Sequence, residues 1–410
     1  MSDRFQPPRG TFDVLPTEAR RRARLLDLAA ELLERAGYGR IDTPAFEETE
    51  LFARGVGGST DIVRKEMFTF EDQGGRSLTL RPEATAAICR AYLSNGMQKL
   101  AQPVKLWWTG PLFRHERPQA GRFRQFTQID AEAIGSDSPL VDAELIILLD
   151  EYLRSLGVPG LTLRIGSLGS LEARAAYRDE LRSYLHAREG ELSADVRERI
   201  DENPLRAFDS KDEGTAAVMA EAPTMLDRLA GADAEHFAAV RDLLDRAGVT
   251  CEVDAGLVRG LDYYTRTVFE FHAEGLGAQS QVAGGGRYDG LIELLGGPAT
   301  AACGWALGVE RVLLALEDEE AERGLAVFVA AADGERERAF ALVTELRRAG
   351  ISADLDLAER SIKGQMKQAD RVGARRTVIL DEDGVRVRDM ESGEQAELDL
   401  SRAVEVLRGE

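Results

Sequence analysis

The sequence predicts an α+β fold built from two or three domains. The chain has 410 residues, and a domain usually takes about 100–200 residues. Segments with the periods of strands and helices are interleaved up to about residue 320, apart from a polar helical stretch at about 170–250. From about residue 325 strand and helix alternate regularly, which is typical of a small α/β domain.

The first hundred residues predict a helix, two strand-like segments and a second helix. Residues 17–37 form an amphipathic pattern with Thr17 as a suitable N-cap and a glycine at the end. Strand-like segments follow at about 38–45 and 66–81. The stretch RPEATAAICRAYLSN, which begins at Arg81, has a proline near its start and helical periodicity after it.

Two strands, at 104–116 and 123–134, are predicted around the loop RPQAGR, and a helix follows at about 139–156. The strand period of two puts four side chains of the second strand on one face: Phe126, Gln128, Asp130 and Glu132. In the first strand it puts Arg114 and Glu116 together. Such faces suit a site that stacks a ring and binds a polar ligand, and they also suit the solvated face of an antiparallel sheet.

Arginines recur at positions where an anion can bind. In the loop of the hairpin and just after it are Arg117, Arg122 and Arg124, whose planar forks suit phosphate oxygens. The segment GLVRGLDYYTRTVFEF at 256–271 reads as a strand, yet it holds Arg259 close to two tyrosines. Arg259 is either a residue of a solvated rim or a ligand for an anion.

Two glycine-containing segments complete this part of the chain. In AGGGRYDGL three successive glycines allow a close approach of the backbone to another group, or else form a tight turn. GWALGVERVLLAL reads as a strand that enters a helix, with Arg311 near the helix N-terminus, where an anion can bind. Arg311 can equally be an exposed arginine, and the acidic residues at 317–323 are a candidate linker.

Composition excludes several classes of protein. No run of about 20 apolar residues is present, and the N-terminus lacks a signal peptide, so a cytoplasmic location is expected. Cys89, Cys251 and Cys303 are far apart, which predicts neither a disulfide framework nor bound zinc. The P-loop and Rossmann fingerprints and the HExxH and GxSxG motifs are missing.

A nucleic-acid partner would need a local basic surface, because the chain carries 72 acidic against 52 basic residues, a net charge of −20. One candidate is the segment 359–376, with six basic and two acidic residues. Lys363, Lys367 and Arg371 recur at the helical spacing, opposite an apolar stripe. The three cations form a basic stripe, which is a candidate contact with a phosphate backbone or else a solvated helix face.

Taken together, these segments resemble the class II aminoacyl-tRNA synthetases, and within that class the histidyl-tRNA synthetase family. The resemblance covers essentially the whole chain. Its segments are PRGTFDVLP (8–16), GRIDTPAFEETELF (39–52, motif 1), LTLRPEATA (78–86), TGPLFRHERPQAGRFRQF (109–126, motif 2), LVRGLDYYTRTVFE (257–270), GGGRYDGL (284–291) and GWALGVERVLLAL (304–316, motif 3).

The resemblance implies a fold, partners and a reaction. It implies a catalytic domain at 1–320 with a six-stranded antiparallel sheet, a helical insertion at about 170–250, and an α/β anticodon-binding domain at 325–410. It implies that histidine reacts with ATP, in the presence of Mg²⁺, to give histidyl-adenylate, and that the histidyl group passes to the 3′ end of histidine tRNA. It further implies that the protein forms a homodimer through motif 1 and that it does not bind a membrane.

The resemblance also implies roles for individual residues. Arg114 and Arg259 would be catalytic, one on each side of the α-phosphate. The ATP site would comprise Arg114, Glu116, Arg122, Phe126 and Arg311. The histidine site would comprise Glu83, Thr85, Arg114, Gln128, Glu132, Arg259, Tyr263, Tyr264 and Tyr288. The tRNA contact would include Lys363, Lys367 and Arg371, and no protein-bound metal is expected.

Three positions depart from the family pattern, and two other functions compete with the synthetase. Thr127, Ala84 and Trp305 stand where relatives often have histidine, glycine and phenylalanine, and Arg266 has no implied role. The synthetase-like regulatory subunit of ATP phosphoribosyltransferase lacks the anticodon domain and usually has degraded arginine motifs. A non-catalytic RNA-binding module on this fold would also lose the phosphate-binding arginines.

Overall fold

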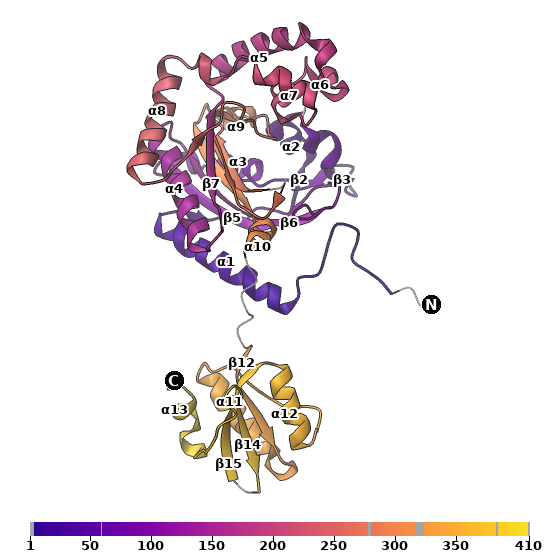
Figure 1. The fold of residues 1–410 in the computed structure, drawn as a ribbon, viewed down its shortest axis with the longest axis vertical. Helices are drawn as coiled ribbons and strands as arrows, with labels where there is room; N and C mark the ends of the chain where they lie inside the picture. Colours follow the sequence, from indigo (N-terminus) through magenta and orange to yellow (C-terminus); the bar gives the residue numbers. More distant parts are fainter. Residues whose placement is uncertain (1–3, 59, 278–279, 317–323, 383, 409–410) are drawn as a thin grey trace. The chain divides into compact units, whose positions relative to one another are not determined.

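The computed structural model describes residues 4–58, 60–277, 280–316, 324–382 and 384–408 (Figure 1). The chain forms two compact units, Met1–Glu317 and Asp318–Glu410. The acidic segment at 317–323 lies outside the described residues.

Unit 1 is built on one large sheet whose six central strands are all antiparallel. The strands, in spatial order, are β1 (Gly39–Arg40), β5 (Val104–Phe113), β6 (Gln125–Ile134), β11 (Ala302–Gly308), β10 (Gln281–Arg287), β9 (Thr265–His272), β7 (Thr162–Ser167) and β8 (Glu252–Val253). The two-residue strands β1 and β8 pair in parallel at the edges. The α+β fold and its six-stranded antiparallel sheet are therefore confirmed, with two short edge strands added.

Helices cover the two faces of this sheet differently (Figure 1). The larger hydrophobic cluster lies between one face and the helices α1 (Pro16–Arg35), α4 (Pro139–Ser155), α8 (Gly231–Arg246) and α10 (Val309–Ala315). The other face packs against α3 (Thr85–Ser94) and the short α9 (Leu291–Leu294). Glu132, Asp130 and Gln128 pair with Leu106, Trp108 and Gly110 on β5, which puts them on this second face.

A small second sheet and one helix lie beside α3. The sheet has the order β2 (Phe46–Glu48), β4 (Ser77–Leu80), β3 (Phe68–Glu71), and α2 (Thr49–Val56) follows β2 directly. The predicted strand at 66–81 is thus a hairpin of two strands. Helix α1 begins at Pro16 without a side-chain cap, so Thr17 is not its N-cap.

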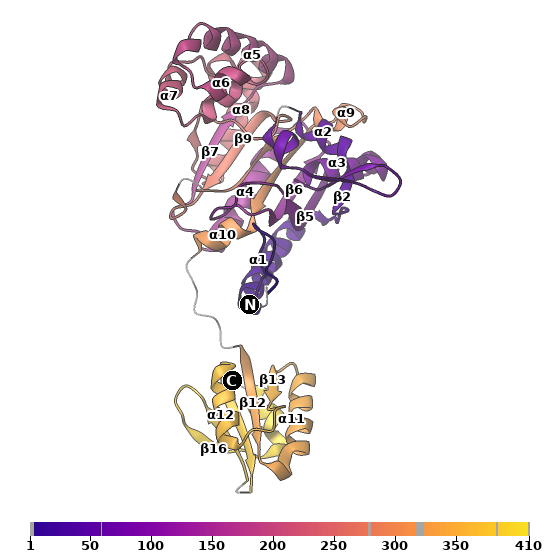
Figure 2. The ribbon, with the colours of Figure 1, turned by 90° about the vertical axis from the view of Figure 1, so that its right-hand side faces the viewer.

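Residues 171–246 form the helical insertion, whose part before α8 has a core of its own, while α8 packs into the larger cluster on the sheet. Its helices are α5 (Leu171–His186), α6 (Ala194–Arg199), α7 (Glu213–Ala220) and α8, with a 3₁₀ segment at Pro204–Asp209. Figure 2 shows α5, α6 and α7 as a group at one end of unit 1. Tyr177, Leu181 and Leu185 are centred in this core, against which Val258 also packs.

The strand predicted at 256–271 is shorter than expected. Only β9, from Thr265 onward, is a strand, and residues 256–264 form an irregular loop. The alternation of Val, Tyr, Phe and Thr favours a strand, but the loop finds its partners among side chains of other elements. Arg259 therefore projects from a loop rather than from a strand.

Unit 2 is a five-stranded mixed sheet with helices on both faces. The strand order is β13 (Ala353–Leu355), β12 (Leu325–Ala331), β14 (Ala374–Asp381), β15 (Gly384–Asp389), β16 (Gln395–Glu397), of which the first three are parallel. One face packs against α11 (Arg336–Arg348) and α13 (Ala403–Arg408), the other against α12 (Ile362–Arg371).

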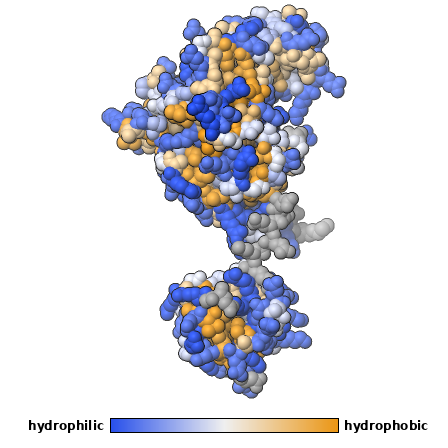
Figure 3. Space-filling model, turned by 60° about the vertical axis from the view of Figure 1, so that its left-hand side comes forward, coloured by the Kyte–Doolittle hydropathy of each residue, from blue (hydrophilic) through white to orange (hydrophobic). Residues whose placement is uncertain are grey.

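On the face seen in Figure 3, hydrophilic residues cover much of the surface of each unit, and hydrophobic residues are interspersed among them. Among the helices described, none combines the length and the apolar character that spanning a bilayer requires.

Candidate active site

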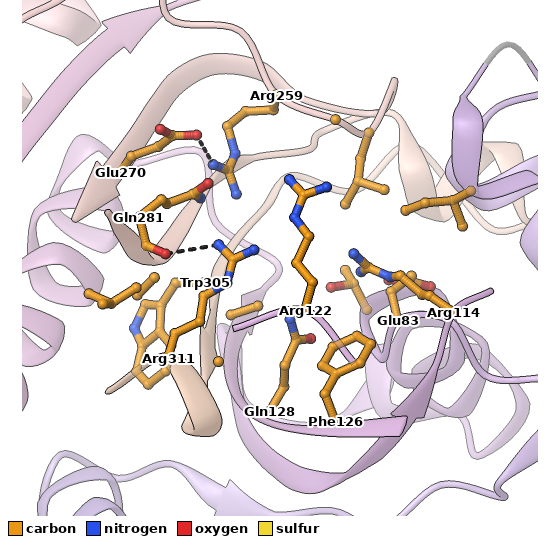
Figure 4. Close-up of a pocket in the computed structure, with 18 of the residues that line it drawn as sticks. Glu83, Arg114, Arg122, Phe126, Gln128, Arg259, Glu270, Gln281, Trp305 and Arg311 are labelled. Atoms are coloured by element: carbon orange, nitrogen blue, oxygen red, sulfur yellow. Dashed lines mark hydrogen bonds and ion pairs between the residues drawn. The ribbon is translucent and has the colours of Figure 1, made fainter. Parts of the chain in front are cut away.

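One cavity of about 570 Å³ opens on the second face of the large sheet in unit 1. Its walls come from β6, β9, β10 and β11, the N-terminus of α3, the irregular loop at 256–264 and the 3₁₀ segment of the insertion. The close-up in Figure 4 shows Phe126 and Gln128 rising from the sheet and several arginines pointing into the space above them.

The closed end of the cavity is acidic. Glu132 accepts hydrogen bonds from the hydroxyls of Thr85 (2.7 Å) and Tyr288, and Glu83 accepts one from the Ala86 N–H (3.1 Å). Burial raises the pKa of Glu132 to about 8, although the two hydroxyl donors oppose the shift. Burial likewise raises the pKa of Glu83 to about 7, against the Ala86 N–H and the charge of Arg114.

Asp130 adds a third carboxyl beside this pair. It is 1% exposed, and burial together with Glu132 and Glu83 raises its pKa well above the ordinary value. Its Oδ1 atom has no hydrogen-bond partner among the described residues. Buried polar atoms usually have hydrogen-bond partners. This end of the cavity therefore offers an acceptor to a ligand that has a polar or cationic group.

Three tyrosines surround the acidic end. The rings of Tyr263 and Tyr264 are 4.8 Å apart, and those of Tyr263 and Tyr288 are 5.6 Å apart. Burial raises the pKa of all three hydroxyls, which therefore act as neutral hydrogen-bonding groups.

Glycines on β10 and β11 make room for these side chains. A Cβ on Gly304 would lie 1.6 Å from the Glu132 carboxylate, and one on Gly285 would lie 2.1 Å from the Gly304 carbonyl oxygen. The glycine run is therefore a strand that lies close to its neighbours, and the alternative of a tight turn is wrong.

The open end of the cavity is basic. Arg114 donates to the Pro82 carbonyl (2.8 Å) and lies over the Phe126 ring, 5.2 Å from its centroid. Arg311 donates to the carbonyls of Gly121 (3.1 Å) and Gln281 (2.9 Å). Figure 4 shows the guanidinium groups of Arg259, Arg122 and Arg311 turned toward one another across the cavity.

Arg259 is held by a chain of polar side chains. It pairs with the Glu270 carboxylate, whose second oxygen is 3.1 Å from His272 Nε2. His272 Nδ1 is in turn 3.0 Å from the Ser280 hydroxyl. The Arg259 guanidinium also lies over the Tyr264 ring. The arginine is thereby held at the cavity wall.

All the sequence-predicted residues of the histidine and ATP sites line this cavity. They are Glu83, Thr85, Arg114, Glu116, Arg122, Phe126, Gln128, Glu132, Arg259, Tyr263, Tyr264, Tyr288 and Arg311. Lys363, Lys367 and Arg371 lie in unit 2, exposed along α12.

Sequence reasoning missed several residues of the cavity wall. Glu270 and His272 are two positions apart on β9, so the strand period could have placed them on one face. Arg206, Asp209 and Lys211 come from the insertion. No local pattern in the sequence marks those three residues, because only the tertiary fold brings them there.

The structure gives surroundings for the three positions that depart from the family pattern and for Arg266, which has no implied role. The Thr127 N–H donates to the Glu310 carboxylate (2.9 Å), which also binds Arg22. Trp305 lines the cavity, and Ala84 is the buried N-cap residue of α3. Arg266 adopts a positive φ of 45° and pairs with Asp233 at 3.1 Å, so its role is to tie β9 to the insertion.

In the described parts of the chain, no cluster of three or more His, Cys, Asp or Glu side chains is placed to hold a metal ion. Cys89 and Cys303 are buried and Cys251 is partly buried.

Family models match both units. Residues 10–312 match the model of histidyl-tRNA synthetase, and residues 326–410 match that of the anticodon binding domain. The chain is 48% identical to the histidine–tRNA ligase of Streptomyces avermitilis, over 98% of this chain and 97% of that protein. It is 46% identical to that of a Geobacillus species, over 98% and 99%.

Solved structures are similar over nearly the whole chain. The apo histidyl-tRNA synthetase of S. aureus has 37% identity and a TM-score of 0.83, covering 98% of this chain and 100% of that one. A protein of Bacillus halodurans described as an ATP phosphoribosyltransferase regulatory subunit/histidyl-tRNA synthetase has 23% identity and a TM-score of 0.68, covering 92% and 97%, and shares the fold.

Proposed function

The chain belongs to the histidyl-tRNA synthetase family, and we propose that the cavity of unit 1 is where it activates histidine. As a histidine–tRNA ligase it converts histidine and ATP to histidyl-adenylate and diphosphate, then transfers the histidyl group to the 3′ end of histidine tRNA. The observation that carries the proposed site is its polarity, with buried carboxyls at the closed end and arginines at the open end.

The closed end suits histidine. Glu83 and Thr85 would receive the α-ammonium group, because a buried carboxyl without a cation is unfavourable and an ammonium corrects this. Glu132 and the three tyrosines would hydrogen-bond the imidazole ring. A pocket that bonds both ring nitrogens rejects a ring of similar shape without them, since its own polar groups would be stranded.

The open end suits ATP. Arg114 and Arg259 would flank the α-phosphate, together with Gln128 near the carboxylate of histidine. Arg311 and Arg122 would bind the outer phosphates, while Phe126 stacks on adenine and Glu116 accepts from its amino group. The carboxylate oxygen attacks the α-phosphorus and diphosphate leaves, so charge develops where preorganised cations already stand.

ATP would enter as its Mg²⁺ complex. Carboxylate oxygens are the ligands that Mg²⁺ prefers in addition to phosphates and water. Glu116 and Glu270 line the basic end of the cavity, but they are assigned to adenine and to Arg259, so phosphate and water oxygens would supply the ligands of a substrate-borne ion.

Assembly, tRNA contact and location are further parts of the proposal. Phe46 and Phe70 of the small sheet are 49% and 43% exposed, with ring centroids 6.2 Å apart. Such an apolar pair, with Phe46 inside motif 1 and Phe70 on strand β3 of the same sheet, favours a homodimer through this surface. The exposed Lys363, Lys367 and Arg371 would contact the tRNA backbone. The reaction belongs to protein synthesis in the cytoplasm.

ATP–diphosphate exchange with each of the 20 amino acids tests the proposed function. We expect exchange with histidine alone. Exchange with none of them contradicts the activation reaction, and exchange with another amino acid contradicts the specificity.

A further inference from the structure

The irregular loop at 256–264, which carries Arg259, Tyr263 and Tyr264, forms no helix or strand that would fix its backbone. It precedes β9, and its residues are outside the sheet. A loop without regular backbone pairing keeps its shape through contacts made by other elements. Leu257, Tyr263 and Tyr264 pack into the hydrophobic cluster beside α3. Three side-chain hydrogen bonds come from the helical insertion.

Arg174, on α5 of the insertion, makes the most direct of these contacts. Its Nη1 atom donates to the carbonyl oxygens of Asp262 (2.7 Å) and Tyr264 (2.8 Å). These two carbonyls flank Tyr263 in the chain, so one guanidinium group fixes the backbone on both sides of it. Burial lowers the pKa of Arg174, while the charge of Asp262 raises it.

Two further contacts join the insertion to the same loop. Asn203, 8% exposed, donates from Nδ2 to the Asp262 carboxylate at 2.9 Å. Val258 packs against the hydrophobic core of the insertion, and a Cβ on Gly256 would lie 3.2 Å from the Phe208 ring. The loop is therefore attached by hydrogen bonds at one end and by apolar packing at the other.

The other side of the loop rests on the end of α2. The Asp262 N–H donates to the Val56 carbonyl (3.2 Å), and a Cβ on Gly57 would lie 2.8 Å from the Asp262 side chain. The insertion grips the neighbouring segment through Arg199–Asp61 (3.3 Å) and Arg64–Glu202 (3.1 Å). Asp262 is thus enclosed between α2 and the insertion.

We propose that the insertion takes part in histidine activation by holding the loop at 256–264 in place. Arg174 and Asn203 are the positioning residues for Arg259, Tyr263 and Tyr264. Neither residue lines the cavity, and both act through the backbone and side chain of Asp262 and the carbonyl of Tyr264. The proposal rests on the assignment of the cavity as the histidine site.

Arg174→Met tests the proposal, with Arg178→Met as its control. Arg178 lies one turn further along α5 and also donates to a backbone carbonyl, that of Glu202, inside the insertion. Because Arg174→Met removes two hydrogen bonds to the loop, we expect the KM for histidine in ATP–diphosphate exchange to rise about tenfold or more. The rate at saturating histidine should also fall through Arg259.

Other measurements distinguish a positioning role from a general loss of folded structure. The KM for ATP should stay within about twofold, because Arg114 and Phe126 are carried by the β5–β6 hairpin. Arg178→Met should match the wild type in both constants. Arg174→Lys, which keeps one charged donor, should recover part of the loss.

Asn203→Ala gives a second measurement on a different element of the insertion, and it decides the matter where Arg174→Met does not fold. We expect a rise of several-fold in the KM for histidine. Constants like those of Arg178→Met in the folded variants would overturn the proposal. Absence of histidine-dependent exchange in the wild type would instead contradict the assigned function.

Discussion

Arg259 is paired with a carboxylate before any phosphate reaches it. Glu270 holds one of its nitrogens, and His272 and Ser280 hold Glu270 in turn. Such an arrangement keeps the guanidinium in place without a substrate, so little reorganisation would be needed if charge develops on an α-phosphate beside it, as proposed.

Removal of this cation is expected to slow adenylate formation. Arg259→Ala should lower the rate of histidine-dependent ATP–diphosphate exchange by roughly two or more orders of magnitude, the usual effect of losing one preorganised charge donor. Arg246→Ala, on the exposed side of α8, serves as control because its side chain is 74% exposed. A rate near that of the wild type would show that Arg259 does not act on the phosphate.

Glu83 gives a pH-dependent prediction about stability. Burial raises its pKa from 4.5 to about 7, so between these values the folded chain binds protons that the unfolded chain has released. Stability contributed by this group is therefore complete below about pH 4.5 and is lost as the pH rises to about 7. Glutamine at this position does not ionise, so the variant does not lose this stability as the pH rises.

The melting temperature of Glu83→Gln, relative to wild type, should therefore rise between pH 5 and pH 8 when both are measured without substrates. Glu235→Gln, at an exposed position of α8, is the charge-matched control. A difference in melting temperature that does not change with pH would contradict the buried protonated carboxyl.

At the scale of elements, β10 and β11 determine how much room the closed end of the cavity has. Gly285 and Gly304 allow the two strands and the Glu132 carboxylate to lie closer than any Cβ would permit. The glycines are needed for lack of volume rather than for an unusual φ, since neither has a positive φ.

Gly304→Ala should reduce kcat/KM for histidine by about tenfold or more, because the new methyl group overlaps the position of the Glu132 carboxylate and meets the Ala131 carbonyl at 2.7 Å. Exchange kinetics measure the effect. Gly190→Ala, in the insertion with open space around the Cβ, is the control. Unchanged kinetics for Gly304→Ala would mean that Glu132 does not bind the substrate.

The same elements show what local patterns can predict. The period of two placed Phe126, Gln128, Asp130 and Glu132 correctly on one face of β6, because both neighbours of that strand are regular. The segment before β9 reads as a strand because its residues favour strands, but it is a loop whose partners include Arg174 and Asn203, far away in sequence. Long-range side-chain partners leave no periodic signal.

At the scale of the whole molecule, the two units carry different chemistry. All the predicted histidine and ATP residues lie in unit 1, whereas the basic stripe of α12 lies in unit 2. In a chain of net charge −20, a local stripe of three cations is the kind of surface that a phosphate backbone can approach.

Charge reversal on this stripe should separate the two half-reactions. Lys363→Glu combined with Lys367→Glu should raise the KM for histidine tRNA by about tenfold, with a weaker dependence on salt, and leave ATP–diphosphate exchange unchanged. The control pair Arg338→Glu and Arg348→Glu on α11 changes the net charge equally. Equal effects of both pairs would show that only total charge matters.

The charge distribution of the cavity has a consequence for inhibitors. Glu83, Asp130 and Glu132 stand at its closed end, and Arg114, Arg259 and others at its open end, so a lipophilic scaffold would leave buried polar groups unpaired. A competitive compound needs a cationic head and an anionic tail. Because the pKa values of Glu83 and Glu132 are about 7 and about 8, a permanently charged head should gain potency as the assay pH rises across that range.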